Sequence, residues 1–318
     1  MKLNYKRTFL IGLAFLSISA FWQMYDNIVP LILQGTFHLN ETVTGTIMAA
    51  DNVLAVFLLP LLGTLSDKAD TKLGKRTPFI VAGTALSVVL MMLLPIADRT
   101  ENFILFVGGL FFLLIAMGLY RSPAVALMPD LTPKPLRSQA NAVINLMGAV
   151  GGIYTLGLIS LLLKGGEKPD YTPVFIGVAG LMVISVVLLV LTIREKKLSA
   201  EVALENLEEE PEEEVKADRT GVLAPEVRRS LRMILISIFL WFMAYNAVTT
   251  AFSRYARTVW GMEGGGFANC LMVATIAAII SYIPIGIISA KVGRKRCILG
   301  GLTLMLISFF AAIFFRQY

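Results

Sequence analysis

The chain has 318 residues, of which 56% are hydrophobic and only 16% charged, and its mean hydropathy is +0.74. This composition lies far from the average of soluble globular proteins and excludes an ordinary soluble domain. The net charge of +6 first points to a polyanionic partner, but the positions of the basic residues, given below, exclude a nucleic-acid binder.

Long apolar runs follow one another along the chain. Runs of about 20 apolar residues match the hydrocarbon thickness of a bilayer at about 1.5 Å of helix rise per residue. They cover approximately residues 8–35, 42–66, 77–97, 102–128, 139–163, 173–193, 231–253, 267–290 and 297–315. The sequence therefore predicts an all-α polytopic membrane protein with nine visible spans.

The connections between these runs differ in charge. When the N-terminus is placed in the cytoplasm, Lys and Arg gather in the cytoplasmic connections, at residues 2–7, 68–76, 134–137, 194–232 and 291–296. This positive-inside pattern predicts a multi-pass protein of the cell membrane with a cytoplasmic N-terminus. The basic residues then report orientation in the lipid bilayer, and no nucleic acid is expected as a partner.

The order of the runs predicts three parts. Residues 1–194 contain six runs and are expected to form an N-terminal six-helix bundle. Residues 195–230 are acidic and polar, which is typical of a solvated cytoplasmic linker. Residues 231–318 contain three runs and are expected to form an incomplete C-terminal bundle. The loop sequence GTLSDK at 63–68 returns as GIISAK at 286–291, which indicates parallel internal repeats.

The loop after the second run carries a recognisable motif. Its pattern G-x-x-x-D-[RK]-x-G-[RK]-[RK] resembles the signature loop of the major facilitator superfamily. The stretches GTLSDKADTKLGKRTPFI (63–80) and YRSPAVALMPDLTPKPLRSQANAVINLMG (120–148) resemble its sucrose-transporter-like branch, the glycoside–cation symporters. The resemblance implies a fold of twelve helices in two parallel six-helix repeats. Because nine are visible, we expect a fragment or a chain that lacks the last quarter of that fold.

Three charged residues fall inside the apolar runs: Asp26, Asp51 and Arg121. Each costs roughly 2.5–3.5 kcal/mol near the bilayer centre, so such residues are expected to pair or to face a wet cavity. One guanidinium cannot neutralise two carboxylates, and an unpaired carboxyl can take up and release a proton. The three are our proton-coupling candidates, with depth favouring Asp51. The resemblance adds that Arg121 matches, by position, the superfamily arginine associated with proton transfer, although Val125 replaces the usual glycine. The alternatives are a buried ion-pair cluster that only fixes helix packing, and sodium coupling.

Polar and aromatic side chains accompany these charges. Amides both donate and accept hydrogen bonds, as sugar hydroxyls require, and aromatic rings stack on the apolar face of a pyranose. The candidate substrate-binding residues are Trp22, Gln23, Tyr25, Asn27, Asn52, Asn141, Asn145, Tyr245 and Asn246. The alternative for each amide is a hydrogen bond between helices, and Gly148-x-x-x-Gly152 indicates close helix packing.

The charged loop is expected to act as a gate. Its candidate residues are Gly63, Asp67, Lys68, Gly74, Lys75 and Arg76, with Gly286, Lys291, Gly293, Arg294 and Lys295 in the second copy. The glycines permit tight turns. We expect Asp67 to pair with the positive end of a helix in the other half, and the basic residues to anchor the membrane face. Ala290 stands where the second copy would need an Asp, so the latch is expected on one side only.

The sequence as a whole predicts a secondary active transporter. We expect a monomer that imports a small glycoside or disaccharide with protons by alternating access. Two alternatives stay open: drug or metabolite efflux by a carrier of the same superfamily, or a truncated membrane protein that does not transport. No nucleotide-binding loop, metal cluster or nucleophile constellation is found in the sequence, so we expect no enzyme activity, cofactor or metal.

Overall fold

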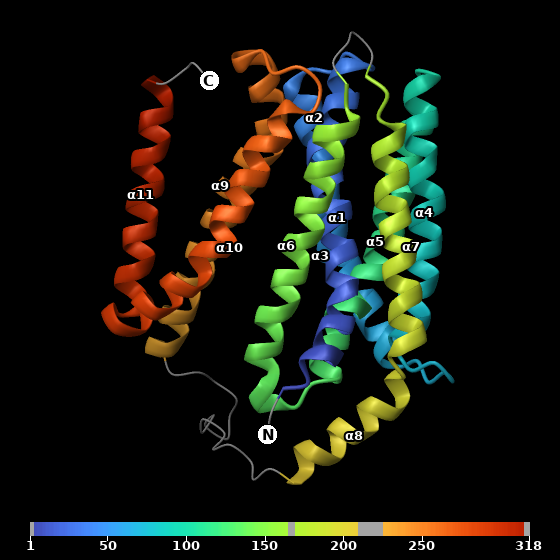
Figure 1. Cartoon of the computed structure of the whole chain (residues 1–318), viewed down its shortest axis with the longest axis vertical. Helices are drawn as coiled ribbons and strands as arrows, with labels where there is room; N and C mark the ends of the chain where they lie inside the picture. The colour runs from blue at the N-terminus through green and yellow to red at the C-terminus, as the bar shows by residue number, and fades with distance from the viewer. Residues whose placement is uncertain (1–2, 165–168, 209–224, 315–318) are drawn as a thin grey trace.

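The computed structural model describes residues 3–164, 169–208 and 225–314, and these form a bundle of helices (Figure 1). The helices are α1 (Tyr5–Gly35), α2 (Glu41–Met48), α3 (Ala50–Asp67), α4 (Thr77–Arg99), α5 (Phe103–Asp130), the 3₁₀ helix η1 (Lys134–Leu136), α6 (Arg137–Leu162), α7 (Thr172–Thr192), α8 (Glu195–Glu208), α9 (Pro225–Trp260), α10 (Gly266–Val292) and α11 (Arg294–Phe314). The all-helical polytopic architecture predicted from the sequence is confirmed.

Seven of the nine expected spans are long and apolar enough to cross a membrane within the described residues. They are α1, α4, α5, α6, α7, α9 and the stretch Glu41–Asp67, in which α2 and α3 follow each other with a break at Ala49. The other two expected spans correspond to α10, whose described apolar stretch is Gly266–Ser281, and to α11.

The helix starts follow from local sequence. Asn4, Asn40 and Asn102 accept hydrogen bonds from the backbone amides three residues further on, at 3.1, 2.8 and 3.0 Å. An Asn side chain at this position satisfies an amide that has no partner inside the helix. Pro78 and Pro173 stand at the first turns of α4 and α7, where a proline costs no hydrogen bond.

Successive helices run in alternating directions, so their connections gather at two ends of the bundle (Figure 1). The loop end carries residues 68–76 and also the helix α8, which lies across it. The cleft end carries residues 36–40, 100–102 and 261–265. The names loop end and cleft end are used below to locate the charged residues and the candidate gating residues.

Helix α1 is the most buried of the candidate spans and packs against α6, α7 and α9. Its contact with α6 is very close, because a Cβ on Gly148 would lie 2.8 Å from Ser19 Oγ, and one on Gly151 would lie 2.0 Å from the backbone oxygen of Leu16. The close packing expected around Gly148 is therefore present. Helix α4 packs on α5 and α7, and α10 packs on α6.

The stretch 195–230 differs at both ends from the solvated linker that its charge predicts. It begins with the helix α8, whose first residue, Glu195, is buried. Helix α9 begins at Pro225, before the expected start at residue 231. Residues 209–224 lie outside the described part of the chain.

Candidate functional site

Asp26, Asp51 and Arg121 come from α1, α3 and α5 and form one electrostatic cluster inside the bundle. Asp51 and Arg121 attract each other, and the charge that acts on Asp26 is Asp51. The sequence led us to expect that these charges pair or face a wet cavity, and their part in proton coupling stays a prediction. Among the described residues, no ion pair within 4.0 Å joins Asp51 to Arg121, so the cluster has room for a proton, a water or a polar group between its members.

Arg121 also contacts an aromatic ring. Its guanidinium carbon lies 5.4 Å from the ring centroid of Trp22, a distance at which a cation is attracted to an indole face. Trp22, Asp51 and Arg121 line a cavity of about 20 Å³ together with apolar side chains of α3 and α5. Such a volume admits about one water molecule. Two of the three candidate charges, Asp51 and Arg121, therefore share one small cavity with the candidate aromatic residue Trp22.

The two carboxylates have different surroundings at similar depth. Asp26 lies nine residues before the end of α1 at Gly35, and Asp51 lies ten residues after the start of α2 at Glu41. Both are therefore about 13–15 Å from the cleft end at 1.5 Å per residue. Depth does not separate them, in contrast to the sequence interpretation that favoured Asp51. The neighbouring charges distinguish the two carboxylates. Asp51 has Arg121 as a counter-charge, whereas the charge that acts on Asp26 is the carboxylate of Asp51.

Tyr25 holds α1 against the break between α2 and α3. The Asn52 amide bonds to the Ala49 carbonyl at 3.1 Å, so the Met48 carbonyl is not used by the regular helix pattern. The buried Tyr25 hydroxyl donates a hydrogen bond to this carbonyl at 3.2 Å. This contact places the start of α3, and with it Asp51, against α1.

Replacing Tyr25 by phenylalanine is expected to lower stability without changing the composition of the cavity. The Met48 carbonyl would lose its partner in a buried place, which costs about 1–3 kcal/mol. The melting temperature of the purified protein in detergent measures this. Tyr5→Phe, on the same helix but 58% exposed, is the matched control and is expected to change nothing. Equal melting temperatures for the two variants would contradict the role given to Tyr25.

The other predicted substrate-binding residues separate into two groups. Gln23 and Asn27 lie on α1 near the cluster, where Asn27 is buried and donates to the Gln23 carbonyl at 2.8 Å. The remaining residues are exposed in this structure: Asn52 on α3, Asn141 and Asn145 on α6, and Tyr245 and Asn246 on α9. Asn52 nevertheless belongs to the charge cluster, because its amide donates a hydrogen bond to Asp51 Oδ1 at 2.7 Å. The structure thus brings Trp22, Tyr25 and Asn52 to the cluster, places Gln23 and Asn27 on α1 beside Asp26, and leaves the other four residues outside it.

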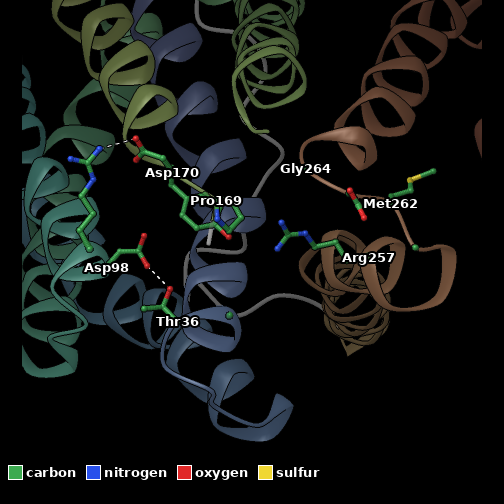
Figure 2. Close-up of a pocket in the computed structure, with 12 residues that line it drawn as sticks. Thr36, Asp98, Pro169, Asp170, Arg257, Met262 and Gly264 are labelled. Carbon is green, nitrogen blue, oxygen red and sulfur yellow. Dashed lines mark hydrogen bonds and ion pairs between the residues drawn. The ribbon is translucent and has the colours of Figure 1, made fainter. Parts of the chain in front are cut away.

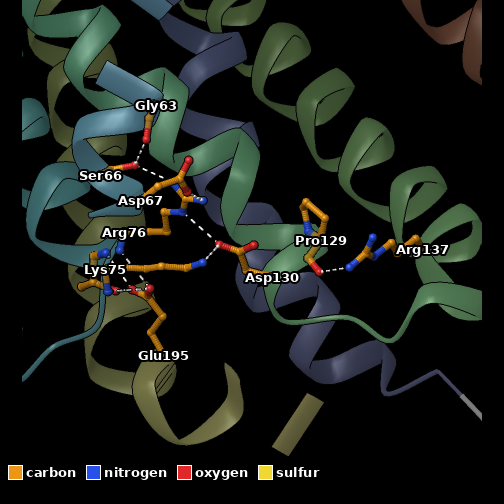
Figure 3. A network of polar contacts seen from close by, with 10 residues as sticks. Gly63, Ser66, Asp67, Lys75, Arg76, Pro129, Asp130, Arg137 and Glu195 are labelled. Atoms are coloured by element: carbon orange, nitrogen blue, oxygen red, sulfur yellow. Dashed lines mark hydrogen bonds and ion pairs between the residues drawn. The ribbon is translucent and has the colours of Figure 1, made fainter. Parts of the chain in front are cut away.

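At the loop end, Arg76 is the centre of a polar network (Figure 3). Its guanidinium donates to Asp130 at 2.9 Å and also to Ser66 and Asp67. Lys75 adds an ion pair with Asp130 at 3.2 Å. Arg76 is buried, so the expectation that it anchors the membrane face is wrong. The network instead ties the ends of α3 and α5 to the start of α4.

Glu195, the first residue of α8, joins this network although it is distant from it in the sequence. Its carboxylate accepts hydrogen bonds from the backbone amides of Lys75 and Arg76, both at 2.9 Å, and from the amide and hydroxyl of Thr77 at 2.7 Å. These amides belong to the start of α4, where helix amides lack internal partners and the helix dipole favours a negative charge. Glu195 therefore caps α4 and fixes α8 at the loop end.

Gly74 is required by this capping arrangement. Its φ is +116°, a conformation that side chains with a Cβ rarely adopt. A Cβ there would also lie 2.4 Å from the Glu195 carboxylate. Glycine is thus required at this position for two reasons: the turn needs its positive φ, and the capping carboxylate needs the space that a side chain would fill.

The expected latch between the two halves is not what the described residues show. Asp67 binds Arg76 of its own loop, which is close in the chain and therefore available without any contact to the other half. Gly63 lies near Ser122 of α5, and Lys68 is exposed. In the second copy, Gly293 has a φ of +97° and Lys295 is exposed. Gly286 and Lys291 lie in α10 and Arg294 begins α11, but the side chains of these three residues lie outside the described part.

The cleft end holds an open cleft of about 830 Å³ (Figure 2). It is lined from one side by Thr36, Asp98 and Asp170 and from the other by Arg257 and the connection after α9. Thr36 donates to Asp98 at 2.5 Å and Arg99 donates to Asp170 at 2.7 Å. These bonds fasten α1 and α7 to the end of α4 and give the cleft a wall of mixed charge.

Hydrogen bonds between the first six spans and the helices α9 and α10 are found at this cleft end. The Gly265 amide donates to the Leu163 carbonyl at 3.0 Å, and Ser160 Oγ lies 2.7 Å from Asn269 Oδ1. Burial raises the pKa of the Tyr171 hydroxyl, and the nearby positive charge of Arg257 opposes this shift. The two parts of the bundle are therefore joined at the cleft end.

Sequence reasoning missed several residues of these sites. Asp130 and Glu195 stand beside apolar runs and next to basic residues, which is typical of a solvated helix end. Ser17 and Tyr120 are fully buried and share a hydrogen bond between α1 and α5, and Tyr120 also donates to the Ala14 carbonyl at 3.0 Å. A polar residue inside an apolar run was the only available signal for this pair.

Comparisons with known proteins agree with the fold and the motif. A sequence model of the Major Facilitator Superfamily matches residues 11–318. Sucrose transport protein SUC4 of Arabidopsis thaliana is 34% identical over 113 residues, which are 31% of this chain and 22% of that protein. Sucrose transport protein SUC3 of Arabidopsis thaliana and sucrose transport protein SUT4 of Oryza sativa subsp. indica are each 26% identical over 151 residues, 42% of this chain and 25% of theirs. The matches thus cover about a quarter of the length of these relatives.

The helical bundle, the charge cluster and the loop network define a multi-pass membrane protein. The chain belongs to the Major Facilitator Superfamily, as the match over nearly its whole length shows. The members of this family are secondary transporters of small molecules. The distant, partial similarity of the chain is to plant sucrose transport proteins.

Proposed function

We propose that the chain imports a small glycoside or disaccharide together with protons. The observation that carries the proposal is the cluster of Asp26, Asp51 and Arg121 beside Trp22, inside the membrane-spanning part. A carboxylate pair served by one guanidinium can exchange a proton, and an indole ring next to it suits the apolar face of a sugar. The partial similarity to sucrose transport proteins supports a sugar-like substrate.

Within the cluster we assign the exchanged proton to Asp26. Arg121 offsets part of the charge of Asp51, which therefore has a counter-charge within the cluster. Asp26 faces the charge of Asp51, and a proton on Asp26 removes this repulsion. Binding and release of that proton then change the electrostatic repulsion between α1 and α3. Proton exchange can thereby shift the two helices relative to each other.

The orientation and the transport cycle form part of the same proposal. The positive-inside pattern makes the loop end cytoplasmic and the cleft end external, in the cell membrane. The hydrogen bonds of Leu163 with Gly265 and of Ser160 with Asn269 then hold the two parts of the bundle together on the external side. Alternating access exchanges these contacts for closure at the loop end.

The three-part organisation also stays a proposal. Residues 1–194 form the six-helix bundle, residues 195–230 connect the parts, and residues 231–318 contribute α9, α10 and α11 as a partial second bundle. We further propose that the protein acts as a monomer.

Proton-coupled uptake is tested in proteoliposomes that contain the full chain and a trapped pH dye. Addition of sucrose, maltose or another small glycoside is expected to acidify the lumen without an imposed gradient. Asp26→Asn is expected to abolish acidification because an amide cannot carry the proton, while exchange of labelled for unlabelled sugar continues. Asp70→Asn is the matched control, since Asp70 is exposed and pairs with Lys196 at the loop end.

The outcomes separate the alternatives. Acidification that persists in Asp26→Asn but is lost in Asp51→Asn makes Asp51 the proton carrier. Sugar uptake that depends on sodium and leaves the luminal pH unchanged contradicts proton coupling. A folded protein with which no glycoside acidifies the lumen contradicts sugar symport and leaves efflux or a non-transporting role as the readings to test.

A further inference from the structure

Arg254 is a half-buried cation in α9 that the proposed proton site does not use. It lies six residues before the end of α9 at Trp260, which is about 9 Å inside the helix end. The surrounding stretch Val227–Trp260 is apolar enough to span a membrane. Within the described part of the chain, its Nε and Nη1 atoms are buried and have no hydrogen-bond partner.

An arginine in this position requires an explanation. A guanidinium stays charged at all accessible pH values and carries five donors in a fixed fork. Buried donors without partners and buried charges without counter-charges are both costly. No described carboxylate lies within 4.0 Å of Arg254, so the compensating group is not supplied by the described residues.

The neighbours of Arg254 connect it to the cleft end. Ser253 is fully buried, and its hydroxyl also lacks a hydrogen-bond partner among the described residues. Arg257 follows one helical turn nearer to the cleft and lines it (Figure 2). Arg257 already acts on the nearby Tyr171 hydroxyl. Arg254 does not itself line the cleft; it lies one helical turn below it, and the cleft is large enough for a small solute.

We propose that Arg254 binds the anionic group of a small solute, a carboxylate or a phosphate. Two donors of one guanidinium edge match the two oxygens of either group. This inference rests on the proposed function for the solute being sugar-like, and it narrows the substrate class to acidic sugars such as uronic acids or sugar phosphates. The anion supplies the counter-charge that the guanidinium requires.

Binding is measured by the shift in melting temperature of the purified full chain at constant ionic strength. The probes are glucuronate, inorganic phosphate and, as the neutral counterpart of the same ring, glucose. Glucuronate or phosphate is expected to stabilise the protein at concentrations where glucose does not. Arg254→Gln is expected to weaken this binding by about 10- to 100-fold, as loss of charge-assisted hydrogen bonds predicts. Arg228→Gln, at the exposed opposite end of α9, is the matched control and keeps full binding.

The same variant without added solute separates this role from a structural one. Because the guanidinium has no described partner, Arg254→Gln is expected to leave the melting temperature of the purified protein unchanged or to raise it. A lower melting temperature shows that Arg254 holds the fold together and overturns the proposal. Equal binding of glucuronate and phosphate by wild type and Arg254→Gln overturns it as well.

The two proposals fail in different ways. If neutral glycosides acidify the proteoliposomes and neither anion binds through Arg254, the anion site is refuted and sugar symport stands. If an anion binds through Arg254 but no glycoside moves protons, the anion site stands and sugar symport is refuted. A response to phosphate without a response to glucuronate supports the site and assigns it to phosphate-bearing solutes.

Discussion

Replacing Gly74 by alanine is expected to lower the melting temperature of the protein strongly and to detach α8 from the start of α4. The new methyl group would lie 2.4 Å from the carboxylate of Glu195 and 2.8 Å from its Cβ. Glu195 cannot turn away freely, because its two oxygens are held by the amides of residues 75–77. The substitution therefore either expels Glu195 from its buried place or distorts the loop.

The size of this effect follows from two independent costs. A residue with a Cβ at positive φ costs about 1–2 kcal/mol, and forcing extra volume into a packed place costs about 1–3 kcal/mol. Gly293→Ala isolates the first cost, because Gly293 has a φ of +97° but a Cβ on it would meet no described atom within 4 Å. Thermal unfolding in detergent is expected to show a clearly larger loss for Gly74→Ala than for Gly293→Ala.

A double-mutant cycle tests the assigned cause. In a Glu195→Gly background both the carboxylate and the Cβ that a side chain at position 74 would meet are absent, so Gly74→Ala is expected to cost no more there than Gly293→Ala does. If Gly74→Ala costs the same in both backgrounds, Glu195 is not the group that excludes a side chain at position 74.

The sequence was informative wherever a residue was costly in its local surroundings. Asp26, Asp51 and Arg121 are expensive inside apolar runs, and the structure places them in one cluster. The span positions likewise follow from hydrophobicity alone, which needs no knowledge of distant contacts. These features were predictable because each depends on the bilayer, a solvent common to all membrane proteins.

Contacts between residues distant in the chain were not predictable in this way. Glu195 stands in a run of charges that resembles any solvated helix start, and only folding brings it to the amides of residues 75–77. Asp67 carries no local sign of whether its partner is Arg76 or a helix of the other half. Single amides such as Asn141 and Asn145 give no sign of which helix face the bundle covers, and both are exposed.

Close approach of α1 and α6 makes Gly151 the second position where one methyl group is expected to have a large effect. A Cβ on Gly151 would lie 2.0 Å from the carbonyl oxygen of Leu16 and 2.8 Å from its carbonyl carbon. Both are backbone atoms inside a helix, so they cannot rotate away as a side chain would. Gly151→Ala must therefore move α1 away from α6, as expected where small residues let helix backbones meet.

This displacement is expected to reach the charge cluster, because α1 carries Trp22 and Asp26. We expect Gly151→Ala to cost about 1–3 kcal/mol or more in stability and to reduce transport in proteoliposomes as well. Gly157→Ala is the control on the same helix, since a Cβ there meets nothing within 4 Å among the described residues. Alanine is the better helix former by about 1 kcal/mol, so Gly157→Ala is expected to leave the melting temperature unchanged or to raise it. A Gly151→Ala protein as stable and active as Gly157→Ala would mean that α1 and α6 are not held at this distance, and that the cluster tolerates their separation.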